Sequence, residues 1–329
     1  MQRRDLLRAA LMAPALAPLA APVARAQPRP GVFDHTIRLI VPNAPGGTSD
    51  ILARLLAPEL TQALGQNVVV ENRAGAGGNI GADAVAKSPP DGHTMLLMDV
   101  STLAINPALF PKLPFDVEKD LAPATMLIYA PYILAVKNAL PVRTAAELNS
   151  YAKANPGTLN AANSGTGTAS HLALLALAEQ WGAPFTHVPY RGGAPGLVAM
   201  STGEADMTIV GATQALPYAT NGQMRALAVT GPRRLRGLPD VPTFRELGWA
   251  VPDAGTWQGL MVQGGTPAAT VERILTTVRE VMARPALSAR IAELGGEPRT
   301  EGPEAFRAWL ARETENYGRL IRANNIRPE

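Results

Sequence analysis

The stretch Ile37–Asp50 (Ile-Arg-Leu-Ile-Val-Pro-Asn-Ala-Pro-Gly-Gly-Thr-Ser-Asp) decides the fold class of this chain. Its short apolar run predicts a buried strand, which two prolines end. The pair Gly46-Gly47 then turns the backbone into a helical pattern, with Thr48 as the expected N-cap. A glycine turn that opens a helix points backbone N–H groups outward at the positive end of the helix dipole. This loop can therefore hold a carboxylate or a phosphate.

Asp50 lies in the first turn of the expected helix, where its carboxylate could orient a water molecule or a ligand amine. The alternative is that Asp50 only complements the helix dipole and that the two glycines only form a tight turn. The stretch by itself leaves both interpretations open.

Strand-like and helix-like segments alternate through most of the chain, which predicts parallel sheets with ligand loops at the carboxyl ends of their strands. Strands are expected at 37–41, 68–71, 94–98, 132–136, 159–162, 185–188, 207–210 and 226–229. Helices are expected between them at 49–64, 79–87, 145–154, 169–181, 195–202 and 214–221. After about residue 239 the pattern becomes helical, at 267–282, 285–294 and 303–324.

Each half of this α/β region is short for a complete domain, so we expect a fold of two lobes. Residues 34–128 and 226–329 would form lobe one, and residues 129–225 lobe two. Each lobe would be a mostly parallel sheet flanked by helices, with a cleft between the lobes. Two crossings, near 127–132 and 225–230, would act as the hinge.

Residues 1–26 have the pattern of an export signal. A pair of arginines precedes an Ala/Leu/Pro run, and Ala24-Arg25-Ala26 predicts cleavage after Ala26. The arginine pair is compatible with the twin-arginine route as well as with Sec. Without this segment the chain keeps 26 basic and 26 acidic residues, so its charge gives no reason to expect nucleic acid or a membrane surface as a partner. The chain has no cysteine, so its stability must come from its core.

Three further loops follow expected strands. In the loop at 99–107, Ser101 and Thr102 offer hydroxyl groups. The loop at 163–171 is a run of small residues that leads into a helix. There Ser164 or Thr168 could be only an N-cap, with His171 on the surface or in the core. The loop at 188–195 again turns into a helix.

Two charged residues are candidates for contacts with a ligand. Arg191 is the best cation for a carboxylate, because its planar guanidinium can bind both oxygens. A solvated arginine in a turn explains it equally well. Asp206 lies between an expected helix and an expected strand, where it either caps the turn or reaches the cleft.

Signatures of other protein classes are missing. The run Gly75–Gly81, with Asp99 about 20 residues further on, resembles a dinucleotide fingerprint, but its glycine spacing is wrong, so we expect no nicotinamide or flavin cofactor. The chain has no Walker loop, no G-x-S-x-G elbow and no cysteine nucleophile. We also expect no metal site, because ligand spacing is absent among the histidines His35, His93, His171 and His187.

Taken together and in this order, the loops resemble the substrate-binding proteins of tripartite tricarboxylate transporters, the Bug family. The similarity covers nearly all of the chain after the expected export signal. Beside the opening stretch, it rests on Val-Glu-Asn-Arg-Ala-Gly-Ala-Gly-Gly-Asn-Ile-Gly81, Ala-Ile-Asn-Pro107, Ser-Gly-Thr-Gly-Thr168 with His171, Val-Pro-Tyr-Arg-Gly-Gly-Ala-Pro195 and Thr-Trp-Gln-Gly-Leu260. No single motif decides the family, but the ordered set is specific.

The resemblance implies a two-lobed periplasmic binding protein, not an enzyme, that closes over a small carboxylate and delivers it to membrane permease subunits. We expect a monomer that binds no cofactor and no nucleic acid. The resemblance also implies that two loops give the ligand carboxylate backbone amides, hydroxyl groups and ordered waters, through Gly46, Gly47, Asp50, Ser164, Gly165, Thr166 and Thr168. The side of lobe two would add Tyr190, Arg191, Gly192 and Asp206. The candidate set is completed by Ser101, Thr102 and His171.

Three departures from the family pattern concern the other end of the ligand, and one of them is the atypical segment Ala199-Met-Ser-Thr-Gly203. Asn43 stands where many members have an aromatic residue, and Leu175 stands where a glutamate is common. The sequence therefore does not identify the ligand. Two other functions stay open, namely an exported hydrolase or cofactor enzyme built on Ser164 and His171, and a ligand sensor for a membrane kinase.

Overall fold

Strand β1 (Ile37–Val41) forms where the opening stretch predicted it, in a computed structural model that describes residues 33–249 and 254–327. It pairs in parallel with β2 (Val68–Asn72) and with β3 (Thr94–Asp99). Leu39 and Ile40, which are neighbours on β1, belong to two different hydrophobic clusters, because successive side chains of a strand point to opposite faces. A strand covered on both faces needs the continuous apolar run that this sequence carries.

Helices cover both faces of this first group of strands. The cluster on one face includes side chains of α1 (Thr48–Leu64), α8 (Ala268–Met282) and α9 (Pro285–Glu293). The cluster on the other face includes side chains of α2 (Asn79–Ala86), α3 (Val100–Leu109) and α10 (Pro303–Ala323). A short 3-10 turn, η1 (Ala76–Gly78), precedes α2.

A second group of parallel strands has the order β7 (Met207–Gly211), β5 (Asn160–Asn163), β6 (Thr186–Pro189). Helices α4 (Ala145–Ala154) and α5 (Ala169–Trp181) pack on one of its faces. Helices α6 (Gly193–Thr202) and α7 (Ala212–Thr220) contribute to the cluster on the other face.

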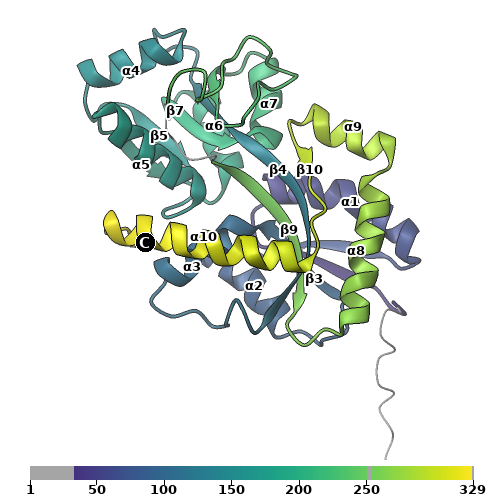
Figure 1. Cartoon of the computed structure of the whole chain (residues 1–329). Helices are drawn as coiled ribbons and strands as arrows, with labels where there is room; N and C mark the ends of the chain where they lie inside the picture. Colours follow the sequence, from purple (N-terminus) through teal and green to yellow (C-terminus); the bar gives the residue numbers. More distant parts are fainter. Residues whose placement is uncertain (1–32, 250–253, 328–329) are drawn as a thin grey trace, which may run out of the picture.

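Two long strands join the two groups. The first part of β4 (Leu121–Val136) pairs with β9 (Gly255–Gln263), and its second part pairs with β7 and β8 (Arg225–Val229). Strand β9 also pairs with β3, and the short β10 (Glu297–Pro298) pairs with β4. Figure 1 shows β4 and β9 running side by side from one group to the other. The chain thus has the predicted two-lobed α/β fold, with parallel strands within each group and antiparallel strands at the junction.

Three elements differ from the sequence-based expectation. Strand β4 begins at Leu121 and not at residue 132, and β9 forms in a region that we expected to be helical. Helix α3 occupies a segment that we expected to be a loop. In β9 the cause is tertiary packing, because a Cβ atom on Gly259 would lie 2.6 Å from Phe306 and 2.7 Å from Val100. Glycine weakens a strand locally, and here it admits the neighbouring elements.

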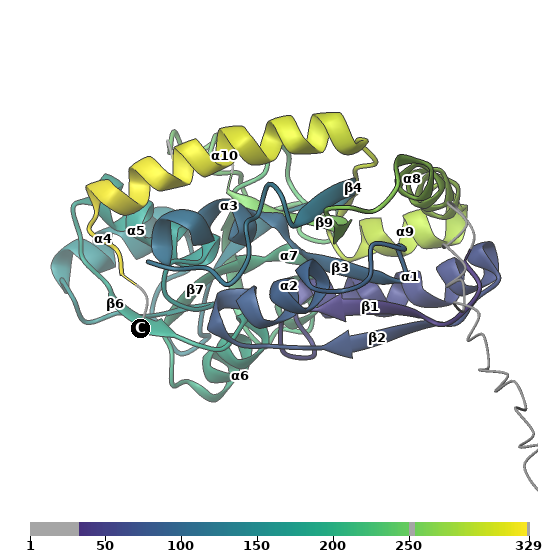
Figure 2. The ribbon, with the colours of Figure 1, turned by 90° about the horizontal axis from the view of Figure 1, so that it is seen from below.

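Helix α10 contacts the hydrophobic clusters of both groups. Phe306 near its start belongs to a cluster of the first group, and Ile321 near its end belongs to a cluster of the second. Figure 2 shows α10 lying along the molecule, from the side of α8 to the side of α4 and α5. Residues 226–229, which we expected in lobe one, lie in β8 and pair with the part of β4 that also carries β7.

In the described ranges, no helix is both long enough and apolar enough to cross a membrane. The expected export signal at residues 1–26, with its cleavage after Ala26, lies outside the described residues.

Candidate functional site

A cleft lies where the two groups of strands meet, at the carboxyl ends of β1, β3, β5, β6 and β7. The space between its walls is about 670 Å³ when the open solvent at its mouth is counted. Its lining consists of Asn43, Ala44, Gly47, Thr48, Ser49, Asp99, Thr102, Tyr132, Ser164, Thr168, Ala169, Ser170, Arg191, Gly192, Gly193, Ala194, Pro195, Gly211, Gln214, Thr256 and Gln258. In open α/β sheets, ligands bind at the carboxyl ends of the strands.

The first turn of α1 forms one wall of this cleft. The N-cap is Gly47 and not Thr48 as we expected, because Thr48 already has helical geometry. In the described structure, no side chain caps this helix start. The backbone N–H groups of the first turn therefore have no side-chain acceptor at the cleft wall. The turn depends on Gly46, whose φ of +86° is in the left-handed region that favours glycine.

Asp50 lies behind this turn and does not belong to the lining. Its Oδ2 accepts hydrogen bonds from Gly46 N (2.9 Å) and Arg54 Nε (3.1 Å), and its Oδ1 accepts one from Asn72 Nδ2 (2.9 Å). Burial acts to raise the pKa of Asp50, but these hydrogen bonds outweigh it and lower the pKa below its ordinary value. The carboxylate thus holds the glycine turn in place, and the N–H of Gly46 is used inside the loop.

The loop before α5 places Ser164 and Thr168 in the lining, whereas Gly165, Thr166 and His171 lie outside it. Thr168 is the N-cap, as one interpretation of the sequence had it. Its hydroxyl accepts from His171 N (3.4 Å) and donates to Gly165 O (2.7 Å).

His171 is a buried residue of this loop. Its Nδ1 accepts from Gly167 N (3.0 Å), and its ring meets the His187 ring edge-on at 4.9 Å. Ser164 thus lines the cleft, whereas His171 lies outside the described lining.

The turn before α6 supplies the cation of the cleft. Arg191 is exposed and lines the cleft, and within the described residues it forms no ion pair with a carboxylate. Gly192 N donates to Ser164 O (3.2 Å), which ties this turn to the loop before α5. Tyr190 lies outside the lining and packs against the hydrophobic cluster around Ala162.

Asp206 lies away from the cleft lining. Its carboxylate forms an ion pair with Lys137 Nζ (2.6 Å) and accepts from Asn160 N (2.8 Å). Asp206 thus joins β5 to the segment after β4. Ser101 is fully buried outside the lining, and Thr102 lines the cleft from the first turn of α3.

The floor of the cleft contains polar residues that sequence reasoning missed. They are Asp99 at the end of β3, Gln214 on α7, and Thr256 and Gln258 on β9. Asp99 carried a usable signal, since it is the first polar residue after an apolar strand. The β9 residues carried none, because that strand was not predicted.

The chain matches the family model described as "Tripartite tricarboxylate transporter family receptor" over residues 52–326. The chain belongs to this family. Protein BugT of Bordetella pertussis (strain Tohama I) is 35% identical to this receptor over 287 residues, which cover 87% of the chain and 88% of BugT.

Solved structures of similar proteins share the fold of this receptor. The periplasmic binding protein BugD is 31% identical with a TM-score of 0.85, covering 90% of the chain and 100% of BugD. Rpa4515 of R. palustris with adipate is 31% identical with a TM-score of 0.83 (90% and 99% covered). MatC of Rhodopseudomonas palustris with bound malate is 31% identical with a TM-score of 0.79 (87% and 99% covered). Family and fold both indicate a periplasmic substrate-binding receptor.

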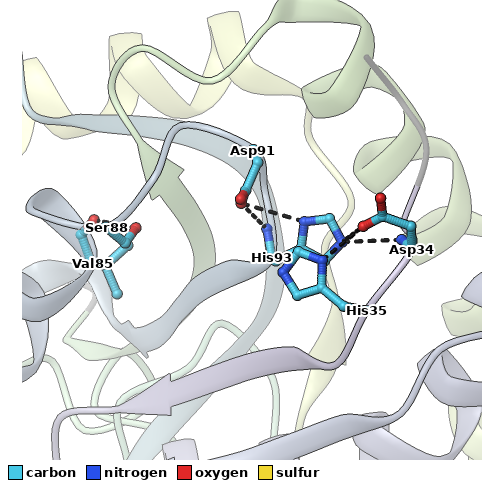
Figure 3. Close-up of polar contacts among 6 residues, drawn as sticks. All are labelled: Asp34, His35, Val85, Ser88, Asp91 and His93. Atoms are coloured by element: carbon cyan, nitrogen blue, oxygen red, sulfur yellow. Dashed lines mark hydrogen bonds and ion pairs between the residues drawn. The ribbon is translucent and has the colours of Figure 1, made fainter. Parts of the chain in front are cut away.

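Two histidines of the receptor that lie far apart in sequence meet outside the cleft. The rings of His35 and His93 stack in parallel at 3.6 Å, between Asp34 and Asp91 (Figure 3). The spacing argument missed this cluster, whose side chains include a possible set of three metal ligands. The lone pair of an imidazole nitrogen lies in the plane of its ring. Because the rings of His35 and His93 are stacked in parallel, they cannot both point such a lone pair at one ion. His93 Nε2 also accepts from Asp34 N (3.2 Å), so we assign no metal to the cluster.

Proposed function

We propose that this receptor binds a small carboxylate in the cleft, in the periplasm, and delivers it to the permease of a tripartite tricarboxylate-type transporter. The ligand carboxylate would bind the first turn of α1 at Gly47, with hydroxyl groups of Ser164 and Thr168 and the guanidinium of Arg191 completing the anchor. The adipate and malate in two structural relatives support a small carboxylate as the ligand class.

The observation that carries this proposal is the surplus of donors at one end of the cleft. The start of α1 has no capping side chain in the described structure, and Arg191 has no carboxylate partner there. Both features line the same cleft, from opposite lobes. A carboxylate fits both, because it complements the helix dipole and accepts two hydrogen bonds from a guanidinium.

Magnitudes favour an anchor shared by both lobes. A helix start stabilises an anion by up to about 2 kcal/mol when partly buried. Micromolar binding needs about 8 kcal/mol. Hydrogen bonds to a charged group contribute about 1.5–3 kcal/mol each before the cost of binding is subtracted. Several donors from both walls of the cleft are therefore needed.

We also propose the lobe assignment and the export of the receptor. The first group of strands with α1–α3 and α8–α10 would be lobe one, and the second group with α4–α7 would be lobe two. The pairing of β8 with β4 supports a return to lobe one after Val229 rather than at residue 226. We keep the proposal that residues 1–26 are removed after Ala26, which N-terminal sequencing of the periplasmic protein tests.

Calorimetry of the chain without residues 1–26 tests the anchor. We expect one or more small carboxylic acids to bind with a stoichiometry of one, unchanged chemically in the recovered solution, and their amides to bind far more weakly. Gly47→Val should abolish binding in a folded protein. The φ of Gly47 is −76°, which valine can adopt, and Ala44 O at 3.7 Å is the nearest atom to a Cβ there. Full affinity in folded Gly47→Val, or equal binding of acid and amide, would contradict the anchor.

Uptake in cells tests delivery. Deletion of the gene should abolish uptake of the labelled ligand, and the wild-type gene should restore it. The Gly47→Val gene should not restore uptake, although its product is exported and folded. Undiminished uptake in the deletion strain would contradict a role in transport.

A further inference from the structure

The floor of the cleft carries a carboxylate with no cation beside it. Asp99 accepts hydrogen bonds from the backbone N–H of Ser101 (3.0 Å) and of Trp257 (3.4 Å). Across residues 33–249 and 254–327, none of the ion pairs includes Asp99. Arg191 is the one cationic residue in the described lining, and it is exposed to solvent. Burial raises the pKa of the Asp99 carboxyl above its ordinary value, although hydrogen bonds from Thr256, Ser101 and Trp257 act to lower it.

Two amide oxygens extend this acceptor-rich floor. Gln258 lies opposite Asp99 in the pairing of β3 with β9 and is fully buried. Its Nε2 donates to Thr256 Oγ1 (2.6 Å), while its Oε1 has no hydrogen-bond partner in the described structure. The Oε1 of Gln214, which is nine-tenths buried, is also without a partner among the described residues. Buried oxygens of this kind normally accept a hydrogen bond.

The hydroxyl of Thr256 does not fill this need. Its oxygen accepts from Gln258 Nε2 (2.6 Å), and the hydroxyl is also a hydrogen-bond partner of Asp99 that acts to lower the pKa of this carboxyl. Gln214 is held against the start of α6, where a Cβ atom on Gly193 would come within 2.2 Å of its amide. The described lining therefore combines donors at Gly47 and Arg191 with the Asp99 carboxylate and with the unpartnered amide oxygens of Gln214 and Gln258.

We propose that the ligand carries, besides its carboxylate, a hydrogen-bond donor in the form of an ammonium or a hydroxyl group, and that Asp99 and Gln258 receive this donor. The proposal rests on the proposed function, since it concerns the same cleft. It narrows the ligand class from carboxylic acids in general to amino acids and hydroxy acids. An ammonium group would also supply the positive charge that is missing beside the Asp99 carboxylate.

Ligands matched in size test this inference in the wild-type receptor. Calorimetry would compare succinate with malate and aspartate, and glutarate with 2-hydroxyglutarate and glutamate. We expect the best amino or hydroxy acid to bind about 10- to 100-fold more tightly than the acid that lacks the donor. A preference for the amino acid would identify the donor as ammonium, and a preference for the hydroxy acid would identify it as hydroxyl. If the unsubstituted acids bind as tightly or more tightly, the inference is wrong while the carboxylate anchor stands. If none of the six acids binds, both proposals fail for these ligands. The Gly47→Val variant then has no binding to lose.

Asp99→Asn tests the residue itself. Asparagine caps a helix as well as aspartate does, so α3 should keep its N-cap. We expect this variant to lose most of the preference for the donor-bearing acid and to bind the unsubstituted acid at least as well as the wild type. Asp83→Asn, which removes a half-buried carboxylate that is paired with Lys87 outside the cleft lining, is the matched control and should retain the preference. An unchanged preference in Asp99→Asn would overturn the assignment. If this variant does not fold, the comparison of ligands in the wild type still decides.

Discussion

The carboxylate of Asp50 joins three parts of the chain that lie at the back of the ligand loop. It holds the N–H of Gly46, the guanidinium of Arg54 and the amide of Asn72, whose Nδ2 also donates to Asn43 O (3.1 Å). Sequence reasoning placed Asp50 at the ligand because it lies in the first turn of α1. The structure gives Gly47 and Asp50 different places: Gly47 lines the cleft, whereas Asp50 lies outside the lining and stabilises the turn.

We therefore expect Asp50→Ala to weaken folding and binding together. Loss of the carboxylate leaves the Gly46 N–H and one N–H of the Asn72 amide without an acceptor, which costs about 1–3 kcal/mol of the free energy of unfolding. Urea denaturation and calorimetry on the same variant measure both effects. A large loss of affinity with an unchanged free energy of unfolding would mean that Asp50 contacts the ligand directly.

At the scale of elements, α10 packs against hydrophobic clusters of both groups of strands. Ile321 is 2% exposed in the cluster that includes α4 and α5, whereas its neighbour Leu320 is 39% exposed. We expect Ile321→Ala to lower the free energy of unfolding by about 2–5 kcal/mol, because it leaves a cavity in that cluster. Leu320→Ala is the matched control and should cost much less. Equal effects in urea denaturation would show that the end of α10 is not packed on the core.

The elements that the sequence predicted are those whose periodicity matches their burial. Strand β1 and helix α1 fall in this class, and so does the N-cap role that one interpretation gave Thr168. Strand β9 could not be predicted, since Gly255 and Gly259 interrupt its apolar pattern and its burial comes from partners distant in sequence. The candidate site followed the same division. Residues on loops after predicted strands were found, whereas Gln258 and Thr256 depended on a strand that only tertiary pairing creates.

For the whole molecule, we expect ligand binding to favour the arrangement described here, in which the lobes touch across the cleft. A Cβ atom on Gly167 would lie 2.4 Å from Leu109, and one on Gly211 would lie 3.0 Å from Thr48 Oγ1. X-ray scattering should give a larger radius of gyration without ligand than with a saturating acid, and the bound profile should match this structure. Identical profiles with and without ligand would contradict closure on binding.

Buried His93 and half-buried His187 make the stability of the whole molecule depend on pH. Burial lowers the pKa of His93, as does the nearby His35, and burial lowers the pKa of His187; the ordinary value is 6.5. As the pH falls below about 6.5, the unfolded chain takes up protons that the folded chain does not. The free energy of unfolding should therefore decrease between about pH 6.5 and the lowered pKa values, by at most about 1.4 kcal/mol per pH unit for each histidine. Urea denaturation of the wild type, His93→Gln and His187→Gln checks this. A slope that neither variant reduces would contradict the assignment.

The anchor on α1 uses main-chain groups, and this has an evolutionary consequence. Substitutions change side chains, but they leave the N–H groups of a helix start where they are. After gene duplication, substitutions at residues such as Gln258 and Gln214 can change which solute is bound, while the main-chain N–H groups still bind the carboxylate. The resulting receptors would bind different solutes that all carry a carboxylate. Relatives that share the sequence of the loop before α1 are accordingly expected to bind solutes of the same charge. The residues on the floor of the cleft would then determine which solute is bound.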